Sequence, residues 1–242
     1  MTDIWTILRK EVLEIWSGGG QRGKWGFVMI IAVFGGYMPY MTGPTWVTSP
    51  LTLVYWAWLP LFFVSSYVAD SFAGERERHT LETLLASRLP DHAILLGKVF
   101  SAVALSMIIT WASVLVGALT ITLVYGEGQI LFYSLAVTLG IFAFSLLGAL
   151  MTAAVGVFVS LRAATVRQAQ QTVSIGIMVI IFVPVLGIQF LPAAWLEQLW
   201  NGVAQMNLNQ IIVAATAIWA LLDVGLLAMA MRRFRRAQLT FD

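Results

Sequence analysis

Six long apolar segments constrain this chain more than any other feature of its sequence. They cover about 25–43, 50–70, 99–125, 129–160, 172–191 and 208–231. Segments of about this length match the roughly 20 residues that a helix needs to cross a hydrocarbon layer. Their apolar residues are continuous rather than alternating, which predicts helices and not barrel strands. The sequence therefore predicts an all-α integral membrane protein with six spans in a single transmembrane domain, 1–242.

The composition supports the membrane assignment. Hydrophobic residues make up 60% of the chain and charged residues 11%, whereas a soluble domain carries roughly 25% charged residues. The chain has no cysteine, which excludes disulfides and thiolate metal sites within it. No basic patch is interleaved with exposed aromatic residues, so the net charge of +2 does not indicate nucleic-acid binding.

The positions of lysine and arginine predict the orientation. All 14 basic residues lie before span one, between spans two and three, between spans four and five, or after span six. The alternate loops, about 44–49, 126–128 and 192–207, contain none. Because basic residues concentrate on the cytoplasmic side of membrane proteins, we expect both termini in the cytoplasm.

Two amphipathic segments are expected to lie along the membrane surface. In the first, 1–24, the apolar residues Ile4, Leu8 and Val12 share a helical face, and a glycine-rich turn follows. This pattern predicts an elbow helix in the interface plane, with a solvated helix as the alternative. The second segment, 192–207, predicts a short amphipathic helix on the outer face, with a plain loop as the alternative.

Span four carries a ridge of small residues. Gly148, Thr152 and Gly156 recur at four-residue spacing, which lets another helix approach closely. We expect this ridge to pack within the chain, and a seam with a second copy is the alternative. The span itself, over about 129–161, is longer than the hydrocarbon core. It is therefore expected to tilt or to project into the cytoplasm.

The spans contain few groups that could carry out chemistry. They hold no His, Cys, Lys or Arg, and the chain lacks zinc-protease, serine-hydrolase and glycine-rich phosphate-loop motifs. We therefore expect no catalytic, cofactor or metal site and no ATP hydrolysis by this chain alone. Asp223 lies well inside span six. A carboxylate at that depth indicates an ion site, a proton relay or a helix-to-helix hydrogen bond. The alternatives are a structural pairing with nearby polar groups and a position in a water-filled vestibule.

Span two is rich in aromatic residues and has Pro60 at its centre. The rings could line a cavity for a hydrophobic or amphiphilic substrate. They could equally form an interfacial belt and lipid-facing bulk. On the first reading, a substrate pathway would combine Asp223 with four aromatic residues of this span, Tyr55, Trp56, Phe62 and Phe63.

A charged segment, 74–98, separates spans two and three. The helix predicted over Glu75–Ser87 has three leucines on one face, and Pro90 follows its end. The sequence thus predicts a short transverse helix at the cytoplasmic surface. Three leucines there need covering by a partner or by lipid headgroups. A solvated helical hairpin without a partner is the alternative.

This segment resembles the one that follows span two in the permease subunits of ABC-2 type ATP-binding-cassette exporters. That family has a glutamate pair, a Thr-Leu-Glu-x-Leu-Leu run, a proline and a Leu-Gly-Lys sequence. The matching residues here are Glu75 and Glu77, Thr80–Leu85, Pro90 and Leu96–Lys98. The predicted elbow, six spans, short outer loops and outer amphipathic helix also agree with the family's architecture.

The resemblance implies the permease subunit of an ATP-driven exporter in the cytoplasmic (inner) membrane of a prokaryote. Two permease subunits, expected to be identical, would form the pathway on two copies of a separate ATPase subunit, which binds ATP and Mg. The transverse helix would be the coupling helix of a cytoplasmic coupling region, 71–98. The residues implied in coupling are Glu75, Glu77, Thr80, Leu81, Glu82, Leu84 and Leu85.

The resemblance does not determine the cargo. The aromatic second span and the scarcity of charge within the membrane favour a hydrophobic or amphiphilic cargo, such as a drug or a lipid. A second function class stays open, a self-sufficient six-helix carrier or channel that uses an ion gradient through Asp223. Only that class predicts transport without ATP, abolished by Asp223→Asn.

Overall fold

The computed structural model describes residues 20–79 and 90–233, and every regular element within them is helical. The predicted all-α class is therefore confirmed for these residues. Residues 1–19 of the predicted elbow and residues 80–89 of the predicted coupling helix lie outside the described residues. The helices are α2 (Gly20–Ile31), η1 (Ala32–Tyr37), α3 (Met38–Thr42), α4 (Thr45–Thr48), α5 (Thr52–Glu77), α7 (Asp91–Tyr125), α8 (Leu135–Ser160), α9 (Val166–Gln189), α10 (Ala193–Ala204) and α11 (Leu208–Arg233).

The described part of the chain contains five segments that are long and apolar enough to cross a membrane. They agree with predicted spans one to four and six, so the chain is an integral membrane protein. The predicted fifth span, 172–191, falls on α9, which is helical over Val166–Gln189. The full count of six spans stays a prediction. The five segments are Trp25–Thr42, Thr52–Glu77, Ala93–Tyr125, Leu135–Ser160 and Leu208–Met231.

The helix boundaries differ from the limits of the apolar segments. α5 ends at Glu77, beyond the apolar segment that ends near 70, and α7 begins at Asp91, directly after Pro90 and before the apolar segment that begins at 99. The charged segment thus adds turns to both helices. α8 begins at Leu135 instead of 129, since a glycine-containing turn and an irregular stretch precede it. The 26 residues of α8 extend about 39 Å, which is still longer than the hydrocarbon core, as predicted. The 35 residues of α7 extend about 52 Å.

The first span is less regular than predicted. α2 begins at Gly20, so residues 20–24 of the predicted elbow segment are helical instead of forming a turn. The π-helix η1 follows, and it packs closely on α7: a Cβ added at Gly35 would lie 2.9 Å from the carbonyl oxygen of Ser113. The Thr120 hydroxyl of α7 donates a hydrogen bond to the Gly35 carbonyl at 2.8 Å. These contacts hold the irregular turn against α7.

α5 packs against α7, α8 and α9, and its closest approach is to the small-residue ridge of α8. A Cβ added at Gly148 would lie 2.8 Å from the carbonyl oxygen of Ala57, and one at Gly156 would lie 2.7 Å from Cγ1 of Val68. Thr152, between the two glycines, is fully buried. The ridge thus packs within the chain, as predicted.

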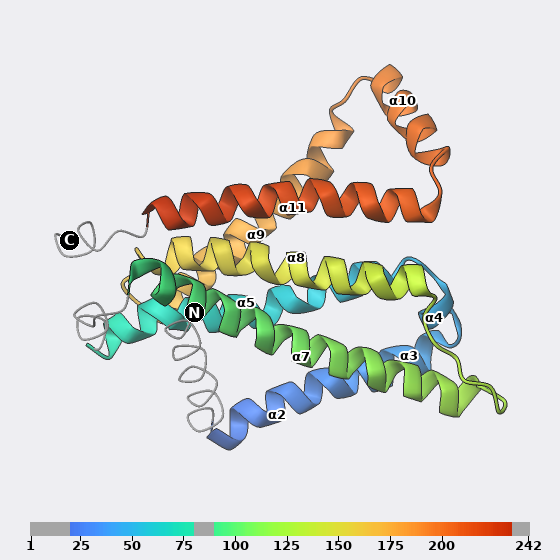
Figure 1. Ribbon diagram of the computed structural model, residues 1–242, viewed down its shortest axis with the longest axis horizontal. Helices are drawn as coiled ribbons and strands as arrows, with labels where there is room; N and C mark the ends of the chain where they lie inside the picture. The colour runs from blue at the N-terminus through green and yellow to red at the C-terminus, as the bar shows by residue number, and fades with distance from the viewer. Residues whose placement is uncertain (1–19, 80–89, 234–242) are drawn as a thin grey trace.

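The long helices lie side by side in a bundle (Figure 1). α5, α8 and α11 run in one direction along it, and α7 runs in the opposite direction. The end of the bundle that holds Glu77, Asp91, Ser160 and Val166 is called the base below. α9 leads away from the base, and α10, at the position of the predicted outer helix, joins it to α11 at the far end. Helices α5, α7, α8 and α9 therefore all have an end at the base.

Candidate functional site

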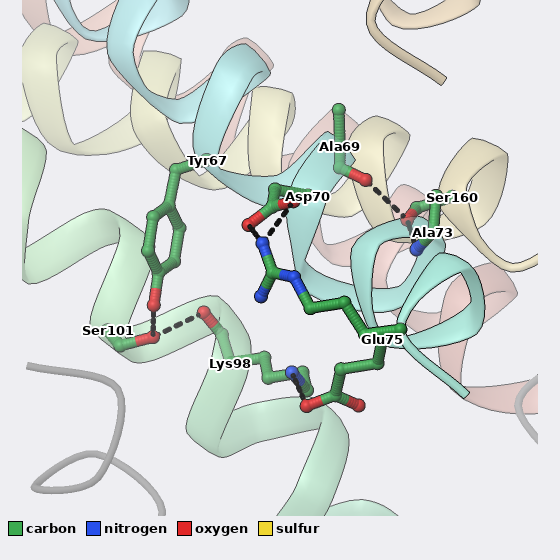
Figure 2. A network of polar contacts seen from close by, with 9 residues as sticks. Tyr67, Ala69, Asp70, Ala73, Glu75, Lys98, Ser101 and Ser160 are labelled. Carbon is green, nitrogen blue, oxygen red and sulfur yellow. Dashed lines mark hydrogen bonds and ion pairs between the residues drawn. The ribbon is translucent and has the colours of Figure 1, made fainter. Parts of the chain in front are cut away.

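The base holds a buried ion pair between α5 and α7 (Figure 2). The Lys98 Nζ atom lies 3.0 Å from the Glu75 Oε1 atom, and the two residues are 2% and 8% exposed. Glu75 lies in the last turn of α5, and Lys98 lies near the start of α7. Because breaking a buried ion pair from one side is strongly destabilising, the pair holds these two helix ends together.

A second polar contact joins the same helices. The hydroxyl groups of Tyr67 and Ser101 lie 3.2 Å apart. The Ser101 hydroxyl donates to the Lys98 carbonyl at 2.8 Å, so Tyr67 is the donor in the contact between the two side chains (Figure 2). α5 and α7 are thus connected at two successive levels next to the undescribed segment 80–89.

Ser160, the last residue of α8, connects that helix to α5. Its hydroxyl donates to the Ala69 carbonyl at 3.1 Å and accepts from the Ala73 N–H at 3.0 Å (Figure 2). These two backbone groups are one helical turn apart, as the partners of a regular α-helical hydrogen bond are. The hydroxyl therefore enters the backbone ladder of α5, an arrangement associated with bends in helices.

Two neighbouring charged residues at the end of α5 contact the α8–α9 connection. The Arg76 guanidinium donates to the carbonyls of Leu161 and Ala163, both at 2.8 Å, which lie where α8 ends. The Glu77 carboxylate accepts from the N–H of Val166, the first residue of α9, at 2.9 Å. A cation thus lies at a helix C-terminus and an anion at a helix N-terminus, where helix dipoles favour them.

The base therefore links four helices through side chains from the last two turns of α5. Its groups form one ion pair and several hydrogen bonds, most of them to backbone atoms. Among the described residues, no three His, Asp or Glu side chains come together as a metal site requires. The two helices next to segment 80–89, α5 and α7, are thus joined to one another, and Arg76, Glu77 and Ser160 join α5 to the ends of α8 and α9.

The structure changes the interpretation of the two predicted coupling glutamates. Glu75 and Glu77 belong to α5, not to a separate helix that begins at Glu75, and the contacts above place both within the chain. Sequence analysis missed the roles of Arg76, Lys98 and Ser160. Lys98 had a detectable signal, because it is the only lysine or arginine between Arg88 and Arg162. The other predicted coupling residues lie outside the described residues. They are Thr80, Leu81, Glu82, Leu84 and Leu85.

The aromatic residues of the predicted pathway are spread over different surroundings. Trp56 is fully buried and lies edge-on to Trp46 at 5.8 Å, and Tyr55 stacks on the same Trp46 ring at 5.3 Å. Phe62 is exposed, and Phe63 contacts Phe27. These four side chains do not line one site together.

A cavity of about 280 Å³ lies instead among other residues of α5, α8 and α11. Its walls include Trp58, Phe144 and Trp219. Asp223, the fifth predicted pathway residue, is buried one turn beyond Trp219 on α11. Asp223 does not line this cavity itself, but the helix places it one turn from Trp219, which does.

Comparison with known families gives a match over most of the chain. The sequence model of a family described as ABC-2 family transporter protein matches residues 47–218. The match includes α5, α7, α8 and α9 and therefore the whole polar network at the base. The comparison with curated proteins gives no match.

Proposed function

Because the chain belongs to the ABC-2 family of transporter proteins, we propose that it is the permease subunit of an ATP-driven exporter that works with a separate ATPase subunit. It forms the membrane pathway, and ATP and Mg are bound by the ATPase. The polar network at the base carries the proposal. It connects both helices that flank segment 80–89 to the rest of the bundle, as a coupling element requires.

In this proposal the base faces the cytoplasm and segment 80–89 contains the coupling helix of region 71–98. Thr80, Leu81, Glu82, Leu84 and Leu85 contact the ATPase, with the leucines as packing anchors. Glu75 and Glu77 do not contact the ATPase in this proposal. They join the end of α5 to Lys98 of α7 and to the first residue of α9. An ATPase-driven shift of the coupling helix is thereby passed to α5, α7, α8 and α9.

The complex contains two permease subunits of this sequence and two ATPase subunits. It lies in the cytoplasmic (inner) membrane of a prokaryote, with both termini of the permease in the cytoplasm. That orientation is supported by the distribution of all 14 basic residues. The cargo is hydrophobic or amphiphilic, in keeping with the apolar spans and the apolar cavity between α5, α8 and α11.

Copurification with the ATPase encoded beside this chain tests the proposal. Wild type should retain the ATPase in detergent, and a Leu81→Asp/Leu85→Asp variant should lose it. The substitutions place two charges in the proposed apolar contact with the ATPase, where a charge without a partner is costly. The matched control is Ile130→Asp/Leu135→Asp, since both residues are exposed at the far end of the bundle. It carries the same added charge and should retain the ATPase.

Each variant must elute as a single species of the wild-type size. If wild type and the Leu81→Asp/Leu85→Asp variant retain the ATPase equally, segment 80–89 does not contain the coupling helix. If the wild-type complex transports cargo with no ATP and Asp223→Asn abolishes that transport, the ion-coupled carrier replaces the exporter.

A further inference from the structure

One face of α11 carries three polar side chains whose oxygen or nitrogen atoms are buried without hydrogen-bond partners in the described part of the chain. Thr216, Trp219 and Asp223 follow one another at spacings of three and four residues, which places them on one side of a helix. The atoms concerned are Oγ1 of Thr216, Nε1 of Trp219 and both carboxylate oxygens of Asp223. Asp223 is only 2% exposed. Such atoms are rare in native proteins, and each one calls for an explanation.

The neighbouring helices offer Asp223 no counter-charge. α11 packs along α8, which has no charged residue in its entire length, and the only charged residue of α9 is Arg167, in its first turn. The charged residues of α5 begin at Asp70, near the base. A lone buried carboxylate within a membrane span is costly, and such residues usually mark an ion or substrate site. Asp223 therefore suits a positively charged ligand.

The apolar cavity lies one helical turn from Asp223. Trp219 belongs to both features, because it lines the cavity and precedes Asp223 by four residues, which is about 6 Å along a helix. A Cβ added at Gly148 would lie 3.8 Å from the Trp219 ring. α8 and α11 run in the same direction (Figure 1), so Asp223 is level with Thr152, one turn after Gly148. Met151, which lines the cavity, adjoins that level.

The walls of the cavity are aromatic and apolar. Phe144 and Trp219 stack with their ring centroids 6.0 Å apart, and Trp58 forms part of the wall from α5. Ring faces of this kind attract organic cations. Val54 and Trp58 both line the cavity and are exposed on the side of the bundle. The cavity therefore opens laterally, at the level of the spans, where a ligand dissolved in the membrane can enter.

We propose that the cavity between α5, α8 and α11 and the adjoining Asp223 bind a lipophilic organic cation. The apolar part of the ligand lies against Trp58, Phe144 and Trp219, and its positive charge lies toward the Asp223 carboxylate. The identification of this ligand as cargo rests on the proposed exporter function. Binding itself needs only this chain, so it can be tested without an ATPase, and failure of one proposal is distinguishable from failure of the other.

Equilibrium dialysis of the purified chain in lipid nanodiscs tests the site, with tetraphenylphosphonium as the probe. Wild type should bind this cation saturably, and Asp223→Asn should weaken binding about tenfold or more, because a charge contact outside bulk water is lost. Trp219→Leu should also weaken binding, since it removes the ring shared by the cavity and the polar face. Triphenylphosphine oxide, a neutral compound with three of the same rings, should compete only weakly with tetraphenylphosphonium, because it carries no positive charge.

The matched control is Glu197→Gln, which removes one carboxylate charge from an exposed position on α10 and should bind like wild type. All variants must be monodisperse and have similar midpoints of thermal unfolding. The proposal is overturned if wild type shows no saturable binding of the cation. It is also overturned if Asp223→Asn binds as tightly as wild type, or if neutral triphenylphosphine oxide competes as well as unlabelled tetraphenylphosphonium.

Discussion

The buried Lys98 ammonium group lies 3.0 Å from the Glu75 carboxylate, and this contact joins the two helices that flank residues 80–89. α5 ends two residues after Glu75, and α7 begins seven residues before Lys98. Both ends of the proposed coupling segment are therefore anchored to one another. A force applied to this segment has to move α5 and α7 together or break a buried ion pair.

Breaking this pair from either side should destabilise the protein. Lys98→Met or Glu75→Gln alone should cost about 3–5 kcal/mol, because each breaks the buried ion pair from one side and leaves the other charge in place. The double variant Glu75→Gln/Lys98→Met should recover most of that loss, since both charges of the pair are removed together. Thermal unfolding of the purified variants in detergent measures the effect. A double variant that is as unstable as the sum of the single variants would contradict this account.

Arg76 and Arg78, both at the end of α5, allow the stability contributions of a part-buried and an exposed arginine to be compared. Arg76→Met should destabilise the α8–α9 connection by about 2–3 kcal/mol, because the guanidinium hydrogen bonds to two carbonyls are lost. Arg78→Met removes only an exposed pair with Asp70 and should cost less than about 1 kcal/mol. Limited proteolysis near residues 161–166 and thermal unfolding check both. Equal effects of the two substitutions would show that the Arg76 contacts contribute little.

The close approach of α5 and α8 should depend on Gly148. Gly148→Ala should destabilise the bundle by about 1–3 kcal/mol, because the new methyl group would meet the backbone carbonyl of Ala57 at 2.8 Å. Gly225→Ala in α11 is the matched control, since a Cβ there meets nothing within 4 Å. The control should leave the unfolding midpoint unchanged or raise it through better helix propensity. A Gly148→Ala variant as stable as this control would mean that the helices can separate at little cost.

Single cysteines can establish the orientation and the fifth span, because the chain has no cysteine of its own. Glu127, Arg162 and Glu197 are all exposed, and the predicted topology puts Glu127 and Glu197 outside and Arg162 in the cytoplasm. A membrane-impermeant maleimide should therefore label Glu127→Cys and Glu197→Cys on intact cells. Arg162→Cys should react only after the membrane is permeabilised. Labelling of Glu197→Cys only after permeabilisation would show that α9 does not cross the membrane.

Most of the helical architecture could be predicted from the sequence, and the reason is physical. A backbone within lipid has to satisfy its hydrogen bonds locally, so a long apolar segment has few alternatives to a helix. The packing of Gly148 and Gly156 could be predicted for a related reason, since closely packed membrane helices need small residues at the contact. The boundaries near 77, 91 and 135 were less predictable, because apolar length says little about where a helix ends outside the membrane.

The network at the base could not be predicted to the same extent. Glu75, Arg76 and Glu77 have the polarity of a solvated surface, and the family resemblance implied a coupling role, through polar contacts or pairs within the helix, for the two glutamates alone. Their actual partners are Lys98 and backbone groups about 90 residues away at the α8–α9 connection. Ser160 had no signal of its own, because a serine near a helix end is common and its contact with α5 depends on how two helices cross.

The sequence alone determined that this protein is a helical membrane protein, that its basic residues favour one side, and that Asp223 is out of place in an apolar span. These properties follow from the local cost of placing each residue in lipid. Only the tertiary structure decided that Glu75 meets Lys98, that Arg76 and Glu77 contact the ends of α8 and α9, and that Asp223 lies beside an aromatic cavity. Those relationships depend on how distant helices approach and cross, which no local pattern of residues specifies.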